Sequence, residues 1–220
     1  MRVAIVTQAF EAYYLKGLKR LRDSLSNVNA EGIDLMAVSG EGDHKKFPYG
    51  FKVKAMREAE QKGYDIAIWV DSNAHFKKHP QPIIDRCIEQ GYWISTMGWN
   101  VGQWCSDAAL PKLDLTREEA WDITMVGACV YALKFNTKLA QHILEYMEKH
   151  EDALPGAWTN KNGEVSKTPG VLGHRHDQTV LSVAAYRFNL KIDKPPCLLA
   201  YANNDGKYEE QAVVFKEGIL

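Results

Sequence analysis

The chain has 220 residues, of which 45% are hydrophobic, 27 are basic and 28 are acidic, so its formal net charge is −1. This balance supplies enough apolar side chains for one folded domain and gives no reason to expect a nucleic-acid partner. The longest apolar runs have the length of strands, which argues against a membrane-spanning segment. The first ten residues lack a basic leader, and the four cysteines form no CxxC pair. We therefore expect a cytoplasmic protein with reduced thiols.

Strand-like and helix-like segments alternate from residue 1 to about residue 95. Short apolar runs rich in β-branched residues predict buried strands, and apolar residues at helical spacing predict amphipathic helices. The expected strands are residues 3–6, 33–38, 65–70 and 92–96. The expected helices begin near residues 15, 51 and 80, and a polar loop is expected at 40–50. This order predicts an α/β fold, with a mostly parallel central sheet and helices on both of its faces.

The second half of the chain is less regular. Residues 98–121 show no clean periodicity and predict an aromatic-rich insertion, whereas residues 125–133 predict one strand. Asn136 is expected to cap a helix, and a stretch rich in glycine, proline and asparagine predicts a loop at 154–173. The last helix is expected at 177–188, with short strands near 191–192 and 212–215.

The segment YDIAIWVDSNAHF, residues 64–76, begins as a buried strand and ends in polar side chains. Asp71 follows the apolar run directly, so it lies at the carboxyl end of a strand, where parallel α/β sheets bind ligands. Asn73 is two residues further on and points to the same side if the backbone is extended. Carboxylate and amide oxygens suit a hard divalent cation, although Asp71, Ser72 and Asn73 also favour a plain turn.

Residues 64–80 resemble the Asp-x-Asp region of nucleotide-sugar glycosyltransferases with the GT-A fold, a Rossmann-like nucleotide-diphospho-sugar transferase fold. In that family an apolar strand ends in Asp-x-Asp, and a hydrophobic residue and a proline follow. Asp71, Asn73, Phe76 and Pro80 hold these places, with Asn73 as a neutral, weaker ligand instead of the second Asp. The resemblance implies that Asp71, Ser72 and Asn73 bind the donor, and that Asp71 and Asn73 hold Mn²⁺ or Mg²⁺.

The segment GHRHDQTVLS, residues 173–182, resembles the Asp-Gln segment that opens a late helix in the same family. The resemblance implies that Asp177 and Gln178 are catalytic and face the donor sugar, and that His174 or His176 completes the metal shell. The two histidines are two residues apart, and at most one of them is expected to face the site. Alternatively, Asp177 is a helix N-cap and the histidines lie on the surface.

The resemblance assigns two further groups to the donor. In the family the loop after the first strand holds the nucleoside, which implies donor-binding roles for Thr7, Gln8 and Tyr13. A basic residue of the helix before the Asp-x-Asp strand reaches the phosphates, and Arg57 is the candidate because a guanidinium can bind phosphate oxygens in pairs. Alternatively, the tyrosine packs on the sheet and Arg57 is a solvated helix charge.

An acceptor site is expected in the aromatic-rich insertion, where Trp99, Trp104 and Asp107 are the candidates, with Trp158 from the later loop. Sugar rings present C–H faces that pack on indoles, and their hydroxyls hydrogen-bond to carboxylates; alternatively, several of these tryptophans belong to the core. On this interpretation residues 1–220 form one GT-A-like domain. Residues 1–97 are its nucleotide-binding half and residues 98–220 its acceptor-binding and catalytic half.

These resemblances imply a hexosyltransferase-like glycosyltransferase that moves a sugar from a UDP- or GDP-linked donor to a hydroxyl group of a carbohydrate acceptor. Asp177 is the base in an inverting enzyme or positions the donor in a retaining one, and the residues do not separate these roles. One alternative is a nucleotide-sugar binding module without turnover, which Asn73 favours. Another is a metal-dependent phosphohydrolase, which requires a metal cage rich in carboxylates.

Overall fold

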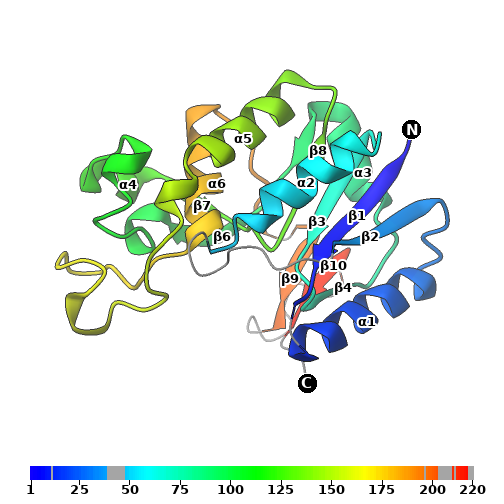
Figure 1. Ribbon diagram of the computed structural model, residues 1–220, viewed down its shortest axis with the longest axis horizontal. Helices are drawn as coiled ribbons and strands as arrows, with labels where there is room; N and C mark the ends of the chain where they lie inside the picture. The colour runs from blue at the N-terminus through cyan, green and yellow to red at the C-terminus, as the bar shows by residue number, and fades with distance from the viewer. Residues whose placement is uncertain (11, 39–47, 196, 203–209, 211, 218–220) are drawn as a thin grey trace.

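The computed structural model describes residues 1–10, 12–38, 48–195, 197–202, 210 and 212–217 (Figure 1). Most of the polar loop expected at 40–50 lies outside these residues. The central sheet has five strands in the order β2-β1-β3-β8-β5, and all run in one direction except β8, which is antiparallel to both of its neighbours. The bounds of these strands are Val3–Gln8 (β1), Ile33–Val38 (β2), Ile66–Val70 (β3), Tyr92–Trp93 (β5) and Val130–Lys134 (β8).

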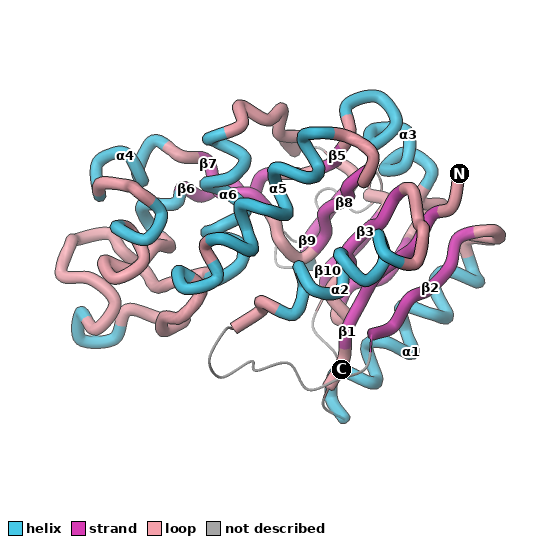
Figure 2. Tube along the Cα trace, turned by 45° about the horizontal axis from the view of Figure 1, so that its top comes forward, coloured by secondary structure: helices cyan, strands magenta, loops and turns pink. Residues whose placement is uncertain are grey.

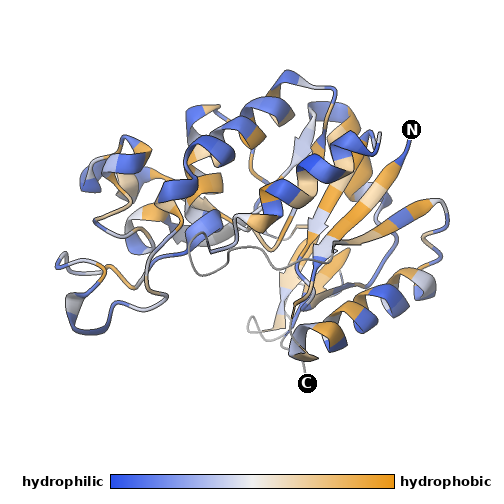
Figure 3. Cartoon of the chain, viewed as in Figure 1, coloured by the Kyte–Doolittle hydropathy of each residue, from blue (hydrophilic) through white to orange (hydrophobic). Residues whose placement is uncertain are grey.

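Helices cover both faces of this sheet, which confirms the predicted α/β architecture (Figure 2). Along β1, Val3 and Ile5 pack with Leu21 on one face, whereas the alternate residues Ala4 and Val6 belong to the cluster on the other face. Figure 3 shows the apolar strands between helices whose outer sides are hydrophilic. The first face carries α1 (Ala12–Asn27) and α3 (Gln81–Gln90), and the second carries α2 (Phe51–Gln61), α5 (Lys138–Lys149) and α6 (His176–Arg187).

The single strand predicted at 125–133 is two strands in the structure. Residues 127–129 leave the sheet between β7 (Thr124–Val126) and β8, and β7 pairs instead with β6 (Thr96–Asn100). A third small sheet has the order β4-β10-β9, and its strands are Ala74–Phe76 (β4), Leu199–Tyr201 (β9) and Val214–Lys216 (β10). The strand predicted at 212–215 corresponds to β10, which begins two residues later and ends one residue later.

The aromatic-rich insertion and the later loop form the part of the molecule on the left of Figure 1, around α4 (Arg117–Asp122). Thr116 and Glu119 begin α4 with a capping box, in which each side chain accepts a hydrogen bond from the other's backbone N–H. The remaining short helices are η1 (Val101–Gln103), η2 (Pro111–Leu113), η3 (Glu151–Ala153) and η4 (Lys161–Gly163). Among the described residues, no helix is long and apolar enough to cross a membrane.

Helix ends follow the local sequence in most places. Gly91 ends α3 in the left-handed conformation, with φ of 91°, as its position after the apolar stripe predicts. At α5 the cap is one residue later than predicted: the Thr137 hydroxyl, not Asn136, accepts the hydrogen bond from the backbone N–H of Ala140.

Candidate active site

Asp71 lies at the carboxyl edge of the central sheet, directly after β3. The backbone N–H of Asp71 donates to the carbonyl of Cys129, 2.8 Å away, and the Asp71 carbonyl accepts from Ala74 and closes a turn. Because β8 is antiparallel to β3, its first residue, Val130, pairs with Val70, so the segment that precedes β8 reaches the same edge. The turn and the strand end expected from the sequence are therefore both present.

Lys52, in the first turn of α2, is the centre of a buried ionic cluster. Its ammonium nitrogen lies 2.9 Å from Asp71 Oδ1 and 2.9 Å from Asp177 Oδ2, and it donates to the carbonyl of Ala128 at 3.0 Å. Only 3% of the Lys52 side chain is exposed. Three oxygen atoms thus lie within 3.0 Å of this ammonium group, which has three N–H donors. Lys52 thus joins the two carboxylates that the sequence motifs singled out.

Asp177 reaches this cluster from the first turn of α6. The turn begins at His176, whose backbone has φ of 45°, a value that residues other than glycine rarely adopt. His176 Nδ1 lies 2.8 Å from the carbonyl of Leu154, which fixes the ring. The predicted catalytic neighbour Gln178 follows in the same turn and is half-buried. The entry into α6 therefore directs Asp177 towards α2.

Lys216 completes the cluster on the other side of Asp71. It is the last residue of β10, opposite Ala74 of β4, and its ammonium nitrogen donates to Asp71 Oδ2 at 3.1 Å. Lys216, Asp71, Lys52 and Asp177 thus form a line of alternating charges, which we call the charge line. The Trp69 indole N–H also donates to Asp71 Oδ1, at 2.9 Å.

The two carboxyl groups of the charge line have opposite pKa shifts. Burial favours the neutral form of Asp71, but Lys52 and Lys216 outweigh it and lower its pKa to about 2. Burial raises the pKa of Asp177, and Lys52 offsets this only in part. Lys52 itself has a raised pKa, because the attraction of the two carboxylates exceeds the cost of its burial. Two carboxyl groups with diverging pKa values are a common feature of acid–base sites.

The lowered pKa of Asp71 makes a prediction about stability in acid. Because the folded pKa of about 2 lies below the ordinary value of 3.8, this carboxylate stabilises the fold above pH 4, and its contribution is lost as the pH falls towards 2. The loss is expected to be about 2 kcal/mol in the free energy of unfolding. Urea unfolding at several pH values measures the difference in free energy of unfolding between wild type and Asp71→Asn. This difference should shrink by the same amount as the pH falls from 4 towards 2, and a difference that stays constant would contradict the assignment.

Aromatic rings surround the exposed side of the site. The Tyr49 ring lies 5.2 Å from Lys52 Nζ and 5.2 Å from the His176 ring, and Trp158 lies 5.0 Å from His176. The guanidinium of Arg175 is stacked between Trp104 and Trp158, at 3.6 and 4.4 Å from the ring centres. This stack is a cation–π arrangement, and burial lowers the pKa of Arg175 to about 10.

Two tryptophans near the site, Trp99 and Trp158, are accessible from solvent. Trp99 is 46% exposed and packs edge-on against Trp104, and Trp158 is 50% exposed. Asp177 also lines a cavity of about 120 Å³ with residues of α2 and α5, among them Val53, Lys54 and Met147. Asp177, at one end of the charge line, is therefore next to a cavity, and an exposed aromatic surface lies near it.

The other side chains predicted to bind the donor have varied surroundings. Thr7 is fully buried, and Ser72 is 4% exposed, whereas Gln8 is partly exposed at the end of β1. Tyr13 is 49% exposed and packs edge-on against Tyr14.

Arg57, the predicted phosphate-binding residue, is engaged between two helices. Its guanidinium donates to both carboxylate oxygens of Glu148 at 2.9 Å, and also to Glu60 and Gln141. Because Arg57 is five residues after Lys52, it lies on a different side of α2. The basic residue of this helix that reaches Asp71 is Lys52.

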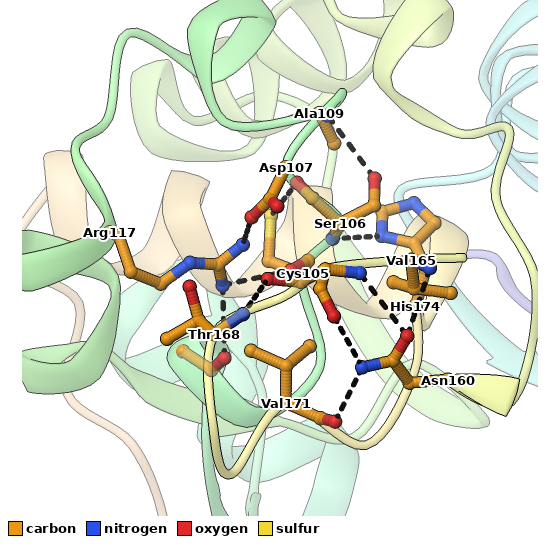
Figure 4. A network of polar contacts seen from close by, with 12 residues as sticks. Cys105, Ser106, Asp107, Ala109, Arg117, Asn160, Val165, Thr168, Val171 and His174 are labelled. Atoms are coloured by element: carbon orange, nitrogen blue, oxygen red, sulfur yellow. Dashed lines mark hydrogen bonds and ion pairs between the residues drawn. The ribbon is translucent and has the colours of Figure 1, made fainter. Parts of the chain in front are cut away.

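The residues predicted as metal ligands do not form a matching donor set. Figure 4 shows His174 Nδ1 accepting from the backbone N–H of Ser106, and its Nε2 is 3.0 Å from the carbonyl of Ala153, so both ring nitrogens are in use. Both carboxylate oxygens of Asp71 are paired with lysines. Asn73 supplies one buried, neutral amide oxygen without a described donor. Among the described residues, no group of three or more His, Cys, Asp or Glu side chains is arranged to hold a metal ion.

Asp107, predicted at the acceptor site, forms an ion pair with Arg117. Both residues belong to the network of polar contacts in Figure 4, which also contains His174. Arg117 also donates to the carbonyls of Gly102 and Cys105, at 3.0 and 2.9 Å. The carboxylate therefore helps to anchor the insertion, although its side chain is 52% exposed.

Lys52 and Lys216 were not predicted, and only the first has a signal in the sequence. Lys52 is three, four and seven residues before Ala55, Met56 and Ala59, so it lies on the apolar, buried side of α2. A lysine in that position requires buried acceptors, which makes it a candidate site residue. Lys216 lies in a three-residue strand whose pairing with β4 is not local, and its neighbours give no such indication.

The sequence matches no model of a known protein family and no curated protein. Among solved structures, the chain is similar to the crystal structure of a glycosyltransferase involved in the glycosylation of the major capsid of PBCV-1. The TM-score is 0.58 at 13% sequence identity, and the likeness covers 98% of this chain and 93% of that chain. The chain therefore shares the fold of this glycosyltransferase over nearly its whole length.

Proposed function

We propose that the protein is a glycosyltransferase of the GT-A type, which transfers a sugar from a nucleotide-diphosphate sugar to a hydroxyl group of a carbohydrate acceptor. The observation that carries this proposal is the joining of Asp71 and Asp177 through Lys52 at the carboxyl edge of the sheet. These carboxylates come from two distant segments that each resemble a glycosyltransferase motif. The fold shared with the PBCV-1 capsid glycosyltransferase supports the same class of activity.

In this proposal the donor binds along the carboxyl ends of β1 and β3, where Gln8 and Tyr13 are accessible to a nucleoside of the uridine or guanosine type. Its diphosphate lies next to Asp71 and the lysines that pair with it. Trp99 and Trp158 offer exposed indole faces to the sugar rings of the acceptor. The stacked guanidinium of Arg175 keeps Trp158 and Trp104 apart as two walls of this surface.

We assign the role of general base to Asp177, in a transfer that inverts the configuration at the sugar. The acceptor oxygen attacks the anomeric carbon, the bond from that carbon to the diphosphate oxygen breaks, and the leaving diphosphate keeps the electron pair. The proton of the acceptor hydroxyl passes to the Asp177 carboxylate. Its raised pKa favours this role, because a base is most efficient when its pKa approaches the working pH. Asp177 lines a cavity, and in this proposal the acceptor hydroxyl group enters it.

Thermal unfolding in the presence of a panel of UDP- and GDP-linked sugars tests donor binding. At least one donor is expected to raise the melting temperature, because a ligand that binds only the folded state stabilises it. The shift should be lost in Asp71→Ala and kept in the control variant Asp85→Ala. Asp85 accepts a hydrogen bond from Gln81 on α3, which lies on the opposite face of the sheet from α2. Absence of a shift with every donor would contradict the proposal.

A further inference from the structure

The charge line already contains the positive charge that a divalent cation brings to a site of this kind. Its two carboxylates, Asp71 and Asp177, are balanced by the two ammonium groups of Lys52 and Lys216. Lys52 is 3% exposed, so its charge is retained in the interior through these contacts. A divalent cation on Asp71 would have to displace a lysine or lie beside two ammonium groups, and both are unfavourable.

The two lysines are equipped for different tasks. Lys52 is buried with three oxygen atoms within 3.0 Å of its ammonium nitrogen, so it holds the two carboxylates in place and is not accessible to a ligand. Lys216 is 25% exposed, and within the described part of the chain Asp71 is its one hydrogen-bonding partner. An ammonium group with one of three donors in use can bind a phosphate oxygen without releasing Asp71.

The fold brings Lys216 to this place through a dedicated contact. In the β10–β4 pair Lys216 is opposite Ala74, and the Ala74 backbone N–H donates to the carbonyl of Asp71. Arg20 of α1 donates to the carbonyl of Asn73 at 2.9 Å, which holds the same turn from the other side. The turn that resembles a metal-binding motif is thus fixed by basic side chains.

We propose that Lys52 and Lys216 replace the divalent cation, so that the protein binds the diphosphate of its donor without a metal ion. This inference rests on the proposed function and narrows it. Lys216 binds the diphosphate and stabilises the charge that develops on it when the sugar leaves. Lys52 keeps Asp71 beside Lys216 and keeps Asp177 directed to the acceptor.

Isothermal titration of the full chain with UDP and with GDP, in EDTA and in MnCl₂, tests this proposal. The preferred nucleotide is expected to bind in EDTA with an affinity within about twofold of that in MnCl₂. Lys216→Met should weaken binding about 10- to 100-fold, the range for one lost charged hydrogen bond. Lys216→Arg should retain binding within a few fold. Lys62→Met is the matched control, because Lys62 forms an ion pair with Glu58 at the exposed end of α2. This variant should bind the nucleotide with the wild-type affinity.

The outcomes separate this inference from the proposed function. Binding that requires MnCl₂ would overturn the metal-free mode and leave a nucleotide-sugar transferase in place. Equal affinity for Lys216→Met and wild type in EDTA would overturn the role of Lys216. No binding of either nucleotide under either condition would overturn both proposals, provided that circular dichroism shows a folded protein.

Discussion

Replacing Lys52 with methionine is expected to lower the free energy of unfolding by about 3–5 kcal/mol, the range for removing one partner of a buried ion pair. The methionine has a similar length, so packing changes little, but Asp71 loses its interior cation and Asp177 loses its described salt-bridge partner. Urea unfolding at pH 7 measures the effect. Lys62→Met, at the exposed end of the same helix, should change the free energy by less than about 0.5 kcal/mol.

A triple variant identifies the cause of this loss. If Lys52→Met destabilises because two carboxylates are left unpaired, then adding Asp71→Asn and Asp177→Asn should recover part of the stability, since no uncompensated carboxylate remains. A triple variant less stable than Lys52→Met alone would show that the loss comes from packing around α2 instead. A single variant as stable as Lys62→Met would contradict the buried ionic cluster itself.

Asp177→Asn is expected to lower the rate of the proposed transfer by about 10²- to 10⁴-fold, the usual contribution of a general base. The amide preserves the shape of the side chain and keeps an oxygen for Lys52, so the fold and donor binding should persist. In the wild type the rate should rise with pH through the raised pKa of Asp177, because only the ionised carboxylate accepts a proton. Steady-state rates from pH 4 to pH 9 measure both effects.

Two results would contradict the role of Asp177. One is an Asp177→Asn variant with a rate within a few fold of wild type. The other is a variant that is slow but keeps the wild-type dependence on pH, because the titrating group would then be elsewhere. Asp85→Asn, on the opposite face of the sheet, is the control for the loss of one surface carboxylate, and we expect it to match the wild type.

Much of the fold could be predicted because local apolar spacing determines it. The strand at 33–38 matches β2, the helix predicted to begin near residue 51 begins there as α2, and the helix predicted at 177–188 matches α6 within one residue. The error at 125–133 has a tertiary cause. Residues 127–129 leave the sheet, and the carbonyls of Ala128 and Cys129 accept from Lys52 and Asp71. A continuous apolar run contains no sign of such contacts.

The site could be predicted in part, because its two carboxylates lie in recognisable motifs and its cations do not. Asp71 and Asp177 were each identified from a few neighbouring residues, and the fold brings both to Lys52. Lys52 was recoverable as a lysine on an apolar helix face. Lys216 was not, since its place depends on the pairing of two three-residue strands that are distant in the sequence.

The most direct measurement of the central claim is the release of nucleoside diphosphate from UDP- and GDP-linked sugars, followed by chromatography with and without a panel of carbohydrate acceptors. Wild type is expected to release UDP or GDP from at least one donor, and to do so faster when an acceptor is present. In Asp177→Asn the rate of release should be at least about 10²-fold lower. A folded wild-type protein that releases neither product from any donor with any acceptor would contradict the claim that this ionic cluster catalyses glycosyl transfer.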